Sequence, residues 1–544
     1  MGTFVNPGNE RFVEDLNSKI YVDKSDMVAV LNEFYCTRDK YICMSRARRF
    51  GKTMMTNLIA AYYSKGCNSR GLFERLKLAT HNGWDRHLNS DNVIMIDVNY
   101  EYNDQEDKLN FVSTLQKNVV DELKETFANV DLANKQSIAS AIAEIFKRTG
   151  ETFVIIMDEY DVLFRDESVE DGVRKKYLEL INALFKSNTA RPAISLAYLT
   201  GILPIARERV QSNLNNFKEF TMLDPKAFAP YFGFSAIEVR TLCQQHGMDY
   251  DRVAAMYDGY LFPSVGHVFN PNSVVNSMMN KDYDSYWNYT SSFEAITCYI
   301  DENDHGIQDD IKQMLEGGEV EINTKLYKNT ITDFDLKDKV FTYLKDKVFT
   351  YLIHLGYLAL VVRDGTTYCR IPNGEVGIEW FNAIQDSKGF ALLKDLVMPS
   401  LEVVKATLEL NAPKVASALD IFHTEYSSAL TYNLESSMQS AILMAYFAAR
   451  RDYMAPIAEF PAGLGFADIA LVPKREGLPA IIVELKKSGS PEVAINQIKS
   501  RNYATALRHH PGKGVILVGI SYNPNDRHHQ CLIEKIPDYT SVWK

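Results

Sequence analysis

The sequence predicts an α/β protein, and two observations lead to this fold class. First, short runs that are apolar throughout alternate with helix-like stretches over residues 1–230. Strands of this kind are buried on both faces, which is typical of a parallel sheet with helices on either side. Second, another succession of strands follows after residue 400. The 544 residues are enough for two or three domains of ordinary size.

The first predicted domain spans residues 1–230. Its apolar runs predict strands over residues 41–44, 93–96, 153–157 and 193–199. Helical periodicity between them predicts helices over residues 54–63, 111–127 and 136–148. Because helices separate the strands along the chain, we expect the strands to run parallel in one sheet.

The middle of the chain, residues 231–400, is richer in helical pattern and in Tyr, Asp and Asn, and it predicts a helical lid and linker region. It contains an immediate repeat, because Lys-Asp-Lys-Val-Phe-Thr-Tyr-Leu fills residues 337–344 and again 345–352. Two copies are too few for a repeat architecture. Eight residues turn a helix about 80° past two full turns. We therefore interpret the repeat as a small insertion that lengthens a helix or a loop.

Residues 401–544 form the third predicted domain. Helical patterns around residues 401–410 and 436–450 lead into strands near residues 468–472, 480–486 and 514–519. A helical start followed by several strands predicts a separate, small α/β domain.

Charge and cysteine content exclude several classes of protein. The net charge of −11 argues against a protein that coats nucleic acid without specificity, although the acidic excess lies in the first 400 residues. None of the seven cysteines forms a CxxC pair, which indicates reduced thiols rather than a disulfide framework or a zinc site. There is no signal-peptide pattern and no apolar run near the roughly 20 residues that span a bilayer. We expect a cytoplasmic protein without a membrane partner.

A phosphate-binding loop is predicted between the first strand and the helix that follows it. Residues 46–53 read Arg-Ala-Arg-Arg-Phe-Gly-Lys-Thr, which fits the Walker A pattern G-x-x-x-x-G-K-[ST] except at the first position. Gly51 permits the backbone to approach phosphate closely, and the helix start offers free N–H groups. Lys52 supplies a cation for the β and γ phosphates, and Thr53 is a ligand for Mg²⁺.

The strand over residues 153–157 ends in Asp158 and Glu159, which is the Walker B arrangement. Asp158 is expected to hold Mg²⁺, and Glu159 to activate the attacking water as a general base. Each half of the site occurs by chance when alone, whereas both halves in this order predict a site for ATP with Mg²⁺.

Four more polar residues are candidates for nucleotide contacts. Arg46, Arg48 and Arg49 suit phosphate recognition, although a solvated basic loop would contain the same residues. Thr200 ends the fourth predicted strand, where a polar side chain is placed to sense the γ phosphate. An ordinary structural role is the alternative for each of the four.

A second acidic group is predicted near the C-terminus. Strand alternation puts Glu484 and Lys486 on one face, and a hairpin brings Asp468 beside them. Two carboxylates there suit Mg²⁺, and Lys486 can orient or help deprotonate water for attack on a phosphodiester. A solvated strand face with Glu and Lys is the alternative, because such faces are common. The pairs His509-His510 and His528-His529 are expected to be solvated rather than to bind metal.

Several motifs, taken together and in this order, resemble the bacterial AAA-ATPase-like family. They are Tyr21-Val22-Asp23-Lys24-Ser25, residues 48–53, residues 157–161, Thr200-Gly201, residues 214–216, residues 257–260, residues 269–273, Tyr286-Trp287 and residues 370–376. In that family the ATPase domain is commonly followed by a PD-(D/E)xK nuclease-like domain, so the resemblance covers nearly the whole chain. It implies a P-loop NTPase core and a C-terminal fold of the restriction-endonuclease type.

The resemblance places Asp468, Glu484 and Lys486 in the nuclease motif, followed by Gln497 and Tyr503 as a Gln-x₅-Tyr helix pattern. Two positions depart from the family. A proline of the phosphate loop is replaced by alanine at position 47, and an arginine two residues before the motif aspartate is replaced by phenylalanine at position 466.

We therefore predict an ATPase module, with Lys52 and Glu159 as its catalytic residues, joined to a Mg²⁺-dependent nuclease-like module that acts on DNA or RNA. Such ATPase sites are often completed between subunits, so homo-oligomers are compatible with this prediction. Two alternatives stay open. One is a nucleotide-dependent switch whose C-terminal domain binds nucleic acid or a protein without cleaving. The other is a scaffold with a vestigial phosphate loop.

Overall fold

The computed structural model describes residues 2–166, 168–205, 216–287, 300, 306–324, 344–386, 390–426, 435–454, 457–462, 465–474, 477–487, 489–503, 507, 514–523 and 526–536. Contacts divide the chain into two compact units. Unit 1 contains residues 1–238, 261–272 and 322–367, and unit 2 contains residues 239–260, 273–321 and 368–544. Among all the described residues, no helix is both long and apolar enough to cross a membrane.

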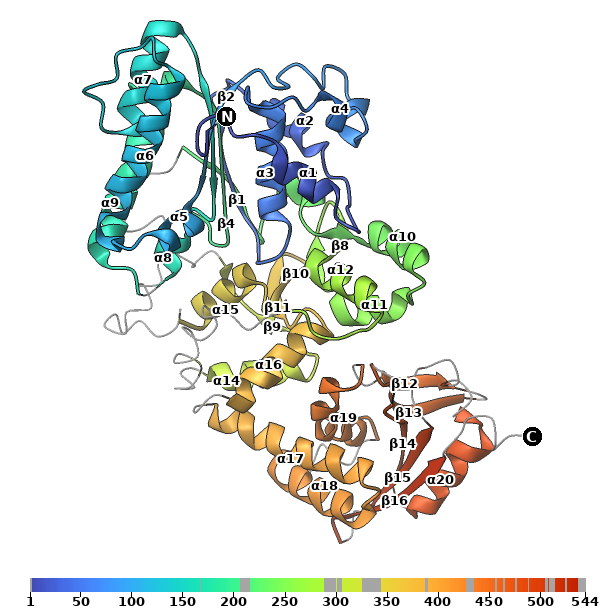
Figure 1. Cartoon of the computed structure of the whole chain (residues 1–544). Helices are drawn as coiled ribbons and strands as arrows, with labels where there is room; N and C mark the ends of the chain where they lie inside the picture. Colours follow the sequence, from blue (N-terminus) through green and yellow to red (C-terminus); the bar gives the residue numbers. More distant parts are fainter. Residues whose placement is uncertain are drawn as a thin grey trace. The chain divides into compact units, whose positions relative to one another are not determined.

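A five-stranded parallel sheet forms the centre of unit 1 (Figure 1). Its strand order is β2-β3-β4-β1-β5, and every neighbouring pair is parallel. The strands are β1 Tyr41–Ser45, β2 Asn92–Asp97, β3 Phe153–Asp158, β4 Ile194–Gly201 and β5 Lys218–Phe220. Every residue of β1, β3 and β4 is buried, so the predicted parallel sheet and α/β class are confirmed.

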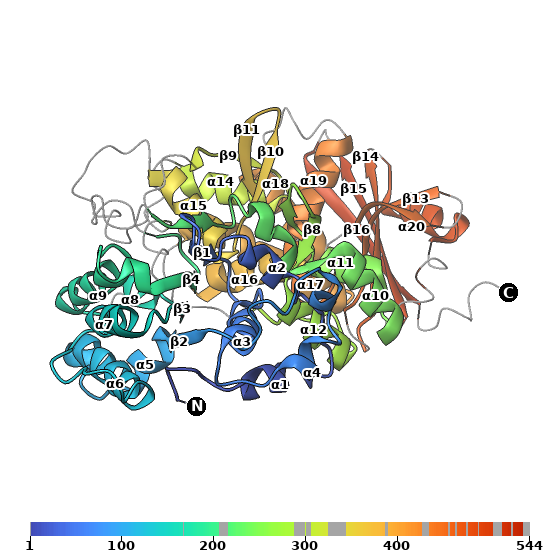
Figure 2. The same ribbon diagram turned by 90° about the horizontal axis from the view of Figure 1, so that it is seen from above.

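Helices cover both faces of this sheet, and alternate strand residues point into two different cores (Figures 1 and 2). Ile155 and Met157 of β3 pack with the helices α6, α7 and α9, whereas Val154 and Ile156 pack with α1, α2 and α3. The helices are α1 Glu10–Leu16, α2 Met27–Asn32, α3 Lys52–Tyr63, α6 Phe111–Thr126, α7 Ile138–Thr149 and α9 Asp171–Phe185. The shorter helices are α4 Arg70–Phe73, α5 Val98–Asp104 and α8 Val162–Arg165.

The ends of α7 illustrate how the sequence sets the helix boundaries. Ser137 accepts a hydrogen bond from the backbone N–H of Ser140 at 3.2 Å, which caps the N-terminus. Gly150 follows the last helical residue with φ +75°, a left-handed conformation that glycine adopts without a steric penalty.

Unit 1 also contains the short antiparallel pair β6 Phe234–Ser235 and β8 Gly266–Phe269. Further along are α15 Leu344–Leu355 and β10 Ala359–Arg363. The second copy of the eight-residue repeat lies in α15, where its apolar side chains are buried. Residues 337–343 of the first copy lie outside the described residues, so the role of the repeat as an insertion stays a prediction.

Unit 2 is built on a five-stranded mixed sheet of order β12-β13-β14-β15-β16 (Figure 1). The strands are β12 Ile457–Ala462, β13 Gly465–Leu471, β14 Ala480–Lys487, β15 Val515–Asn523 and β16 His528–Ile536. Only β14 and β15 run parallel, and the other neighbours are antiparallel. This is the α/β architecture predicted for the C-terminal part of the chain.

The two faces of the mixed sheet are covered by different helices. Side chains at 481, 483 and 485 of β14 pack with α17 Ala391–Leu408, α18 Ala412–Tyr426 and α19 Glu435–Ala445. The helix α20, Pro491–Ser500, packs on β14 and β15. Because side chains alternate along a strand, Glu484 and Lys486 belong to the α20 face.

The chain has further helices and strands outside the two five-stranded sheets and the helices that cover them. They are α10 Ala236–His246, α11 Tyr250–Tyr257, β7 Tyr260–Phe262, α12 Pro271–Asn280, α14 Ile307–Leu315, β9 Val320–Glu321, β11 Thr366–Arg370 and α16 Gly374–Asp386.

Candidate functional site

The phosphate loop connects β1 to the N-terminus of α3, as its sequence predicts. Gly51 is the N-cap of α3 and has φ +87°, and Arg49 has φ +66°. Both values lie in the left-handed region, which lets the loop turn sharply into the helix. The free N–H groups at the start of α3 are therefore directed at the concave side of the loop.

The side chain of Lys52 lies within this loop and is almost fully buried. Its Nζ donates hydrogen bonds to the carbonyl oxygens of Arg46 at 3.2 Å and Ala47 at 3.1 Å, and it lies 3.8 Å from Oε1 of Glu159. Burial lowers the pKa of Lys52, while the charges of Glu159 and Asp158 oppose that effect. The ammonium group thus sits where the loop backbone and the acidic strand end meet.

The strand register brings the ends of β1, β4 and β3 side by side. Met44 pairs with Thr200, and Met157 pairs with Leu199, so Asp158 is the next residue beside Thr200. The hydroxyl of Thr200 is buried and has no hydrogen-bond partner among the described residues. The Thr200 hydroxyl, which can donate and accept a hydrogen bond, therefore lies between the two predicted halves of the site.

Asp158 is 1 % exposed at the end of β3. Thr56 of α3 donates a hydrogen bond to its Oδ2 at 3.4 Å. Burial, together with the charge of Glu159, raises the pKa of Asp158 to about 7, although a hydrogen bond with the Thr53 side chain acts in the opposite direction. Thr53 and Asp158 are thus close enough to share one metal ion. A buried carboxylate with a raised pKa gains most from such a cation.

Glu159 follows with φ +50°, a conformation that is uncommon for a residue with a side chain. Its Oε2 accepts a hydrogen bond from Nη2 of Arg165 at 2.5 Å. Burial alone would raise the pKa of Glu159, but Lys52, Arg165 and Arg48 outweigh burial, so the pKa is lowered. The carboxylate is therefore held ionised, which a general base requires.

Two residues of this group, Asp161 and Arg165, were not predicted as site residues, although Asp161 lies in the motif of residues 157–161. Arg165 pairs with Asp161 at 2.9 Å as well as with Glu159, and both Arg165 and Asp161 are buried. Asp161 also accepts hydrogen bonds from the backbone of Ile202 at 3.0 Å and Leu203 at 2.8 Å. These contacts join the β3 end to the β4 end, and the spacing of charges along the chain does not reveal them.

The side chain of Arg46 packs into the core, so the prediction that Arg46 contacts phosphate is wrong. It is fully buried, with Nη1 donating to the carbonyl oxygens of Ser45 and Phe220, both at 2.8 Å. Its guanidinium lies over the rings of Phe232 and Phe262. Burial lowers its pKa to about 9. Arg46 therefore belongs to the core under the loop.

The two other loop arginines remain near the surface. Arg48 is half-buried and close enough to Glu159 and Arg165 for their charges to act on it, whereas Arg49 is exposed. Burial is the largest cause of the lowered pKa of Arg48, followed by the charge of Arg165. Arg48 is thus within electrostatic range of the acidic strand end.

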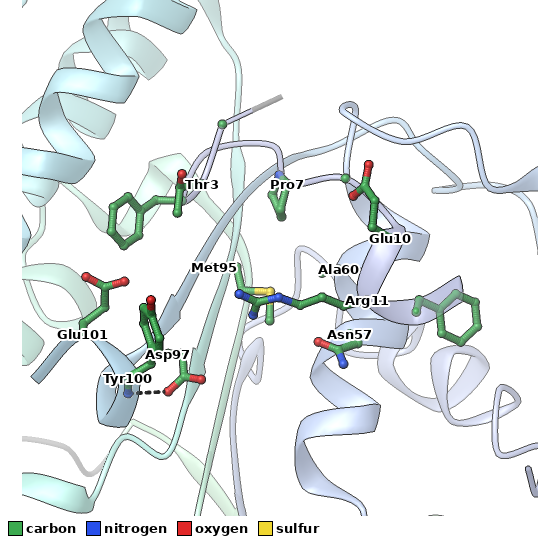
Figure 3. A pocket seen from close by; sticks show the side chains of 14 residues that line it. Thr3, Pro7, Glu10, Arg11, Asn57, Ala60, Met95, Asp97, Tyr100 and Glu101 are labelled. Atoms are coloured by element: carbon green, nitrogen blue, oxygen red, sulfur yellow. Dashed lines mark hydrogen bonds between the residues drawn. The ribbon is translucent and has the colours of Figure 1, made fainter. Parts of the chain in front are cut away.

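A cavity of about 210 Å³ lies beside β2 and α3 in unit 1 (Figure 3). Arg11, Asn57, Asp97 and Glu101 are among the residues that line it. Asp97 caps α5 by accepting a hydrogen bond from the backbone N–H of Tyr100 at 2.9 Å. Asp97 also pairs in register with Asp158, so one residue of the lining lies beside a residue of the candidate nucleotide site.

The second acidic group lies on the α20 face of unit 2. Glu484 is 1 % exposed, and Nζ of Lys486 lies 3.0 Å from its Oε1. Asp468 of the neighbouring strand accepts a hydrogen bond from the backbone N–H of Leu485 at 2.6 Å through Oδ2. Burial and the charge of Asp468 raise the pKa of Glu484. The three residues thus meet across β13 and β14, as the predicted hairpin requires.

One neighbour from α20 completes this group. The side-chain amide of Gln497 donates a hydrogen bond to Oε1 of Glu484. The other carboxylate oxygen, Oε2, is buried without a hydrogen-bond partner among the described residues. A buried, unpaired carboxylate oxygen beside a second carboxylate is the kind of donor set that suits Mg²⁺. In the same domain Tyr503 accepts a hydrogen bond from Arg501 at 3.2 Å.

The prediction that the pair His528-His529 is solvated is wrong for His529. His529 is buried, and its Nδ1 lies 2.8 Å from Oδ1 of Asp420, whereas His528 is exposed and contacts Oδ2 of the same residue at 2.8 Å. Asp420 belongs to α18, and its carboxylate contacts both imidazole rings. The other pair, His509-His510, lies outside the described residues.

These features define an α/β protein with a phosphate-loop site in a parallel sheet and an acidic site in a mixed sheet. Comparison with protein families names both parts. Residues 12–211 match the family of predicted AAA-ATPases, and residues 435–531 match the PD-(D/E)XK nuclease superfamily. The chain therefore contains an AAA-ATPase-like domain and a C-terminal domain of the PD-(D/E)XK nuclease superfamily. No curated protein matches the chain.

Proposed function

We propose that unit 1 binds and hydrolyses ATP with Mg²⁺. The observation that supports this most is the meeting of Lys52, Asp158 and Glu159 at one edge of the sheet, although 106 residues separate the two motifs. Lys52 would bind the β and γ phosphates, and Thr53 with Asp158 would hold Mg²⁺. Bound Mg²⁺ would neutralise phosphate charge, and Glu159 would accept the proton of the attacking water.

The test uses two variants with different expected results. Lys52→Ala removes the phosphate cation, so both ATP affinity and turnover should fall. Glu159→Gln keeps the side-chain volume but cannot accept a proton, so turnover should fall by about 10²- to 10⁴-fold while ATP still binds. Lys117→Ala is the control, because Lys117 is an exposed partner of Asp121 on α6. Unchanged turnover in Lys52→Ala and Glu159→Gln would refute the proposal.

We propose further that unit 2 cleaves nucleic acid with Mg²⁺. Asp468 and Glu484 would hold the ion through carboxylate oxygens that include the unpaired Oε2 of Glu484. Lys486, beside them, would orient the attacking water and stabilise the charge that develops on phosphate. DNA and RNA offer the same phosphodiester, so both are substrates to be tried.

Cleavage of labelled DNA and RNA with Mg²⁺ tests this proposal, in the presence and absence of ATP. Asp468→Ala and Lys486→Met should each abolish cleavage, whereas Lys499→Ala, at an exposed ion pair of α20, should not. Activity that persists in Asp468→Ala would show that another protein in the preparation is responsible.

One observation favours a second candidate function, a nucleotide-dependent switch that binds without cleaving. Oδ2 of Asp468 is engaged by the backbone N–H of Leu485, so this oxygen already serves the fold. Metal binding at Asp468 and Glu484 without any cleavage of DNA or RNA would support the switch.

A further inference from the structure

An exposed aromatic side chain lies next to the acidic site of unit 2. Phe466 of β13 is 61 % exposed, although phenylalanine is among the residue types that are most often buried. It lies two residues before Asp468, so both side chains point to the same face of the strand. Ala467 and Ile469, which alternate with them, are buried.

The distance between these two side chains suits a nucleic acid ligand. Residues two apart on one strand face are separated by about 7 Å. A phosphate at Asp468 and Glu484 would therefore have a flat apolar ring within reach of one of its adjoining bases. An aromatic ring binds any base by stacking on its π face.

Cations on the same side of unit 2 complete the surroundings. Lys486 is partly exposed beside Glu484, and Arg501 is exposed just after α20. The carboxylates of Glu484 and Asp468 act electrostatically on Arg501, although its hydrogen bond with Tyr503 is the main cause of its raised pKa. Phosphates that flank the bound one would find these cations nearby.

From this arrangement we infer that Phe466 is a stacking platform for an unpaired base, so that the substrate of unit 2 is single-stranded nucleic acid. Bases inside a duplex are stacked on each other and offer no free face, whereas single strands and flipped nucleotides do. The inference rests on the proposed nuclease function and adds the class of substrate to it.

Binding is measured on the full chain carrying Asp468→Asn, which prevents cleavage, with single-stranded DNA, single-stranded RNA and blunt duplex of the same sequence. Phe466→Ala should weaken single-strand binding by roughly 5- to 150-fold, the range for loss of one stacked base. It should leave duplex binding unchanged. Phe466→Tyr should keep the single-strand affinity, and so should Val493→Ala, which removes another exposed apolar side chain.

A second variant detects stacking directly by fluorescence. Phe466→Trp places a fluorophore at the platform, and its emission should be quenched by single-stranded oligonucleotides but not by blunt duplex, relative to the same chain with Phe466. The DNA and RNA arms show which sugar is accepted. Equal single-strand affinity in Phe466→Ala, or an equal loss for duplex, would overturn the inference while cleavage that depends on Asp468 still stands. A chain that neither binds nor cleaves any nucleic acid would overturn the proposed nuclease function as well.

Discussion

Nζ of Lys52 lies 3.8 Å from Oε1 of Glu159, so a cation at the start of α3 faces a carboxylate at the end of β3. Lys52 and Glu159 belong to motifs that are far apart in the sequence. Lys52 follows β1 and Glu159 follows β3, and β4 lies between these two strands in the sheet. The attraction between Lys52 and Glu159 helps to keep Glu159 ionised despite its burial. A phosphate bound to Lys52 would compete with Glu159 for this cation.

Arg165 is expected to position Glu159. Without its guanidinium the pKa of Glu159 should rise, because burial would be opposed by fewer charges. A general base works only above its pKa, so the acid limb of the pH profile of ATP turnover should move to higher pH. We expect kcat in Arg165→Ala to fall about tenfold or more, measured between pH 5 and pH 9.

Arg165→Ala also leaves buried Asp161 without its ion-pair partner, which can destabilise a protein by about 3–5 kcal/mol. Arg165→Lys therefore provides the matched variant, since it keeps the charge and should return the acid limb toward its original position. Arg148→Ala, at an exposed pair with Glu144, is the control for loss of an arginine. An acid limb that does not move in folded Arg165→Ala would contradict the positioning role.

Mg²⁺ binding at the nucleotide site should depend on pH near neutrality. The pKa of Asp158 is raised to about 7, chiefly by burial, and a proton on this carboxylate competes with the metal. Below pH 7 the apparent affinity for Mg²⁺ in the presence of ATP should fall by up to about tenfold per pH unit, and above pH 8 it should level off.

Titration calorimetry at pH 6, 7 and 8 measures this dependence. The same carboxyl affects folding, because a raised pKa means that the folded state binds more protons than the unfolded state. The free energy of unfolding without metal should then fall as pH rises from about 4 to 7, and Asp158→Asn should remove this component. An Mg²⁺ affinity that is the same at pH 6 and pH 8 would show that Asp158 is not a ligand.

Gln497 should act on metal binding at Glu484 rather than on nucleic acid. It donates a hydrogen bond to Oε1 of Glu484, and loss of such a supporting contact typically weakens a metal site by about 10- to 100-fold. Titration of Gln497→Ala with Mn²⁺ in the absence of nucleotide measures this loss of metal affinity. The same titration of Glu484→Gln measures the Mn²⁺ that binds elsewhere in the chain, so that it can be subtracted. Lys499→Ala on the same helix is the control. Unchanged Mn²⁺ affinity would mean that α20 does not organise the site.

Gly259 should be essential to the stability of unit 2. It has φ +134°, and a Cβ there would lie 2.0 Å from the carbonyl oxygen of Pro372. Since the backbone must shift to admit a side chain, Gly259→Ala should cost about 2–4 kcal/mol and lower the melting temperature measured by calorimetry.

Two glycines separate the causes of this loss. Gly247 has φ +65° but open space around it, so Gly247→Ala should cost only the backbone strain, about 1 kcal/mol. Gly71 has neither constraint, and Gly71→Ala should be nearly neutral. Equal melting temperatures for Gly259→Ala and Gly247→Ala would exclude the close approach to Pro372 as the cause.

The sequence by itself determined the parts of the molecule that depend on local pattern. Strands that are buried on both faces are mostly apolar, so the four main strands of the parallel sheet could be predicted from short apolar runs. Helix starts and strand ends carry the phosphate-loop and acidic motifs, so the sequence could predict that Lys52, Asp158 and Glu159 lie close together. Glu484 and Lys486 could be assigned to one face because strand side chains alternate.

The tertiary structure decided which side chains meet when no local pattern relates them. Arg46 resembles a phosphate ligand in the loop sequence, yet Phe232 and Phe262 enclose it in the core. His529 resembles a surface residue, yet it is buried and contacts Asp420, more than a hundred residues earlier in the sequence. Burial and charge pairing depend on what the rest of the chain places nearby. A linear sequence shows the candidates for such contacts, and only the packed fold selects among them.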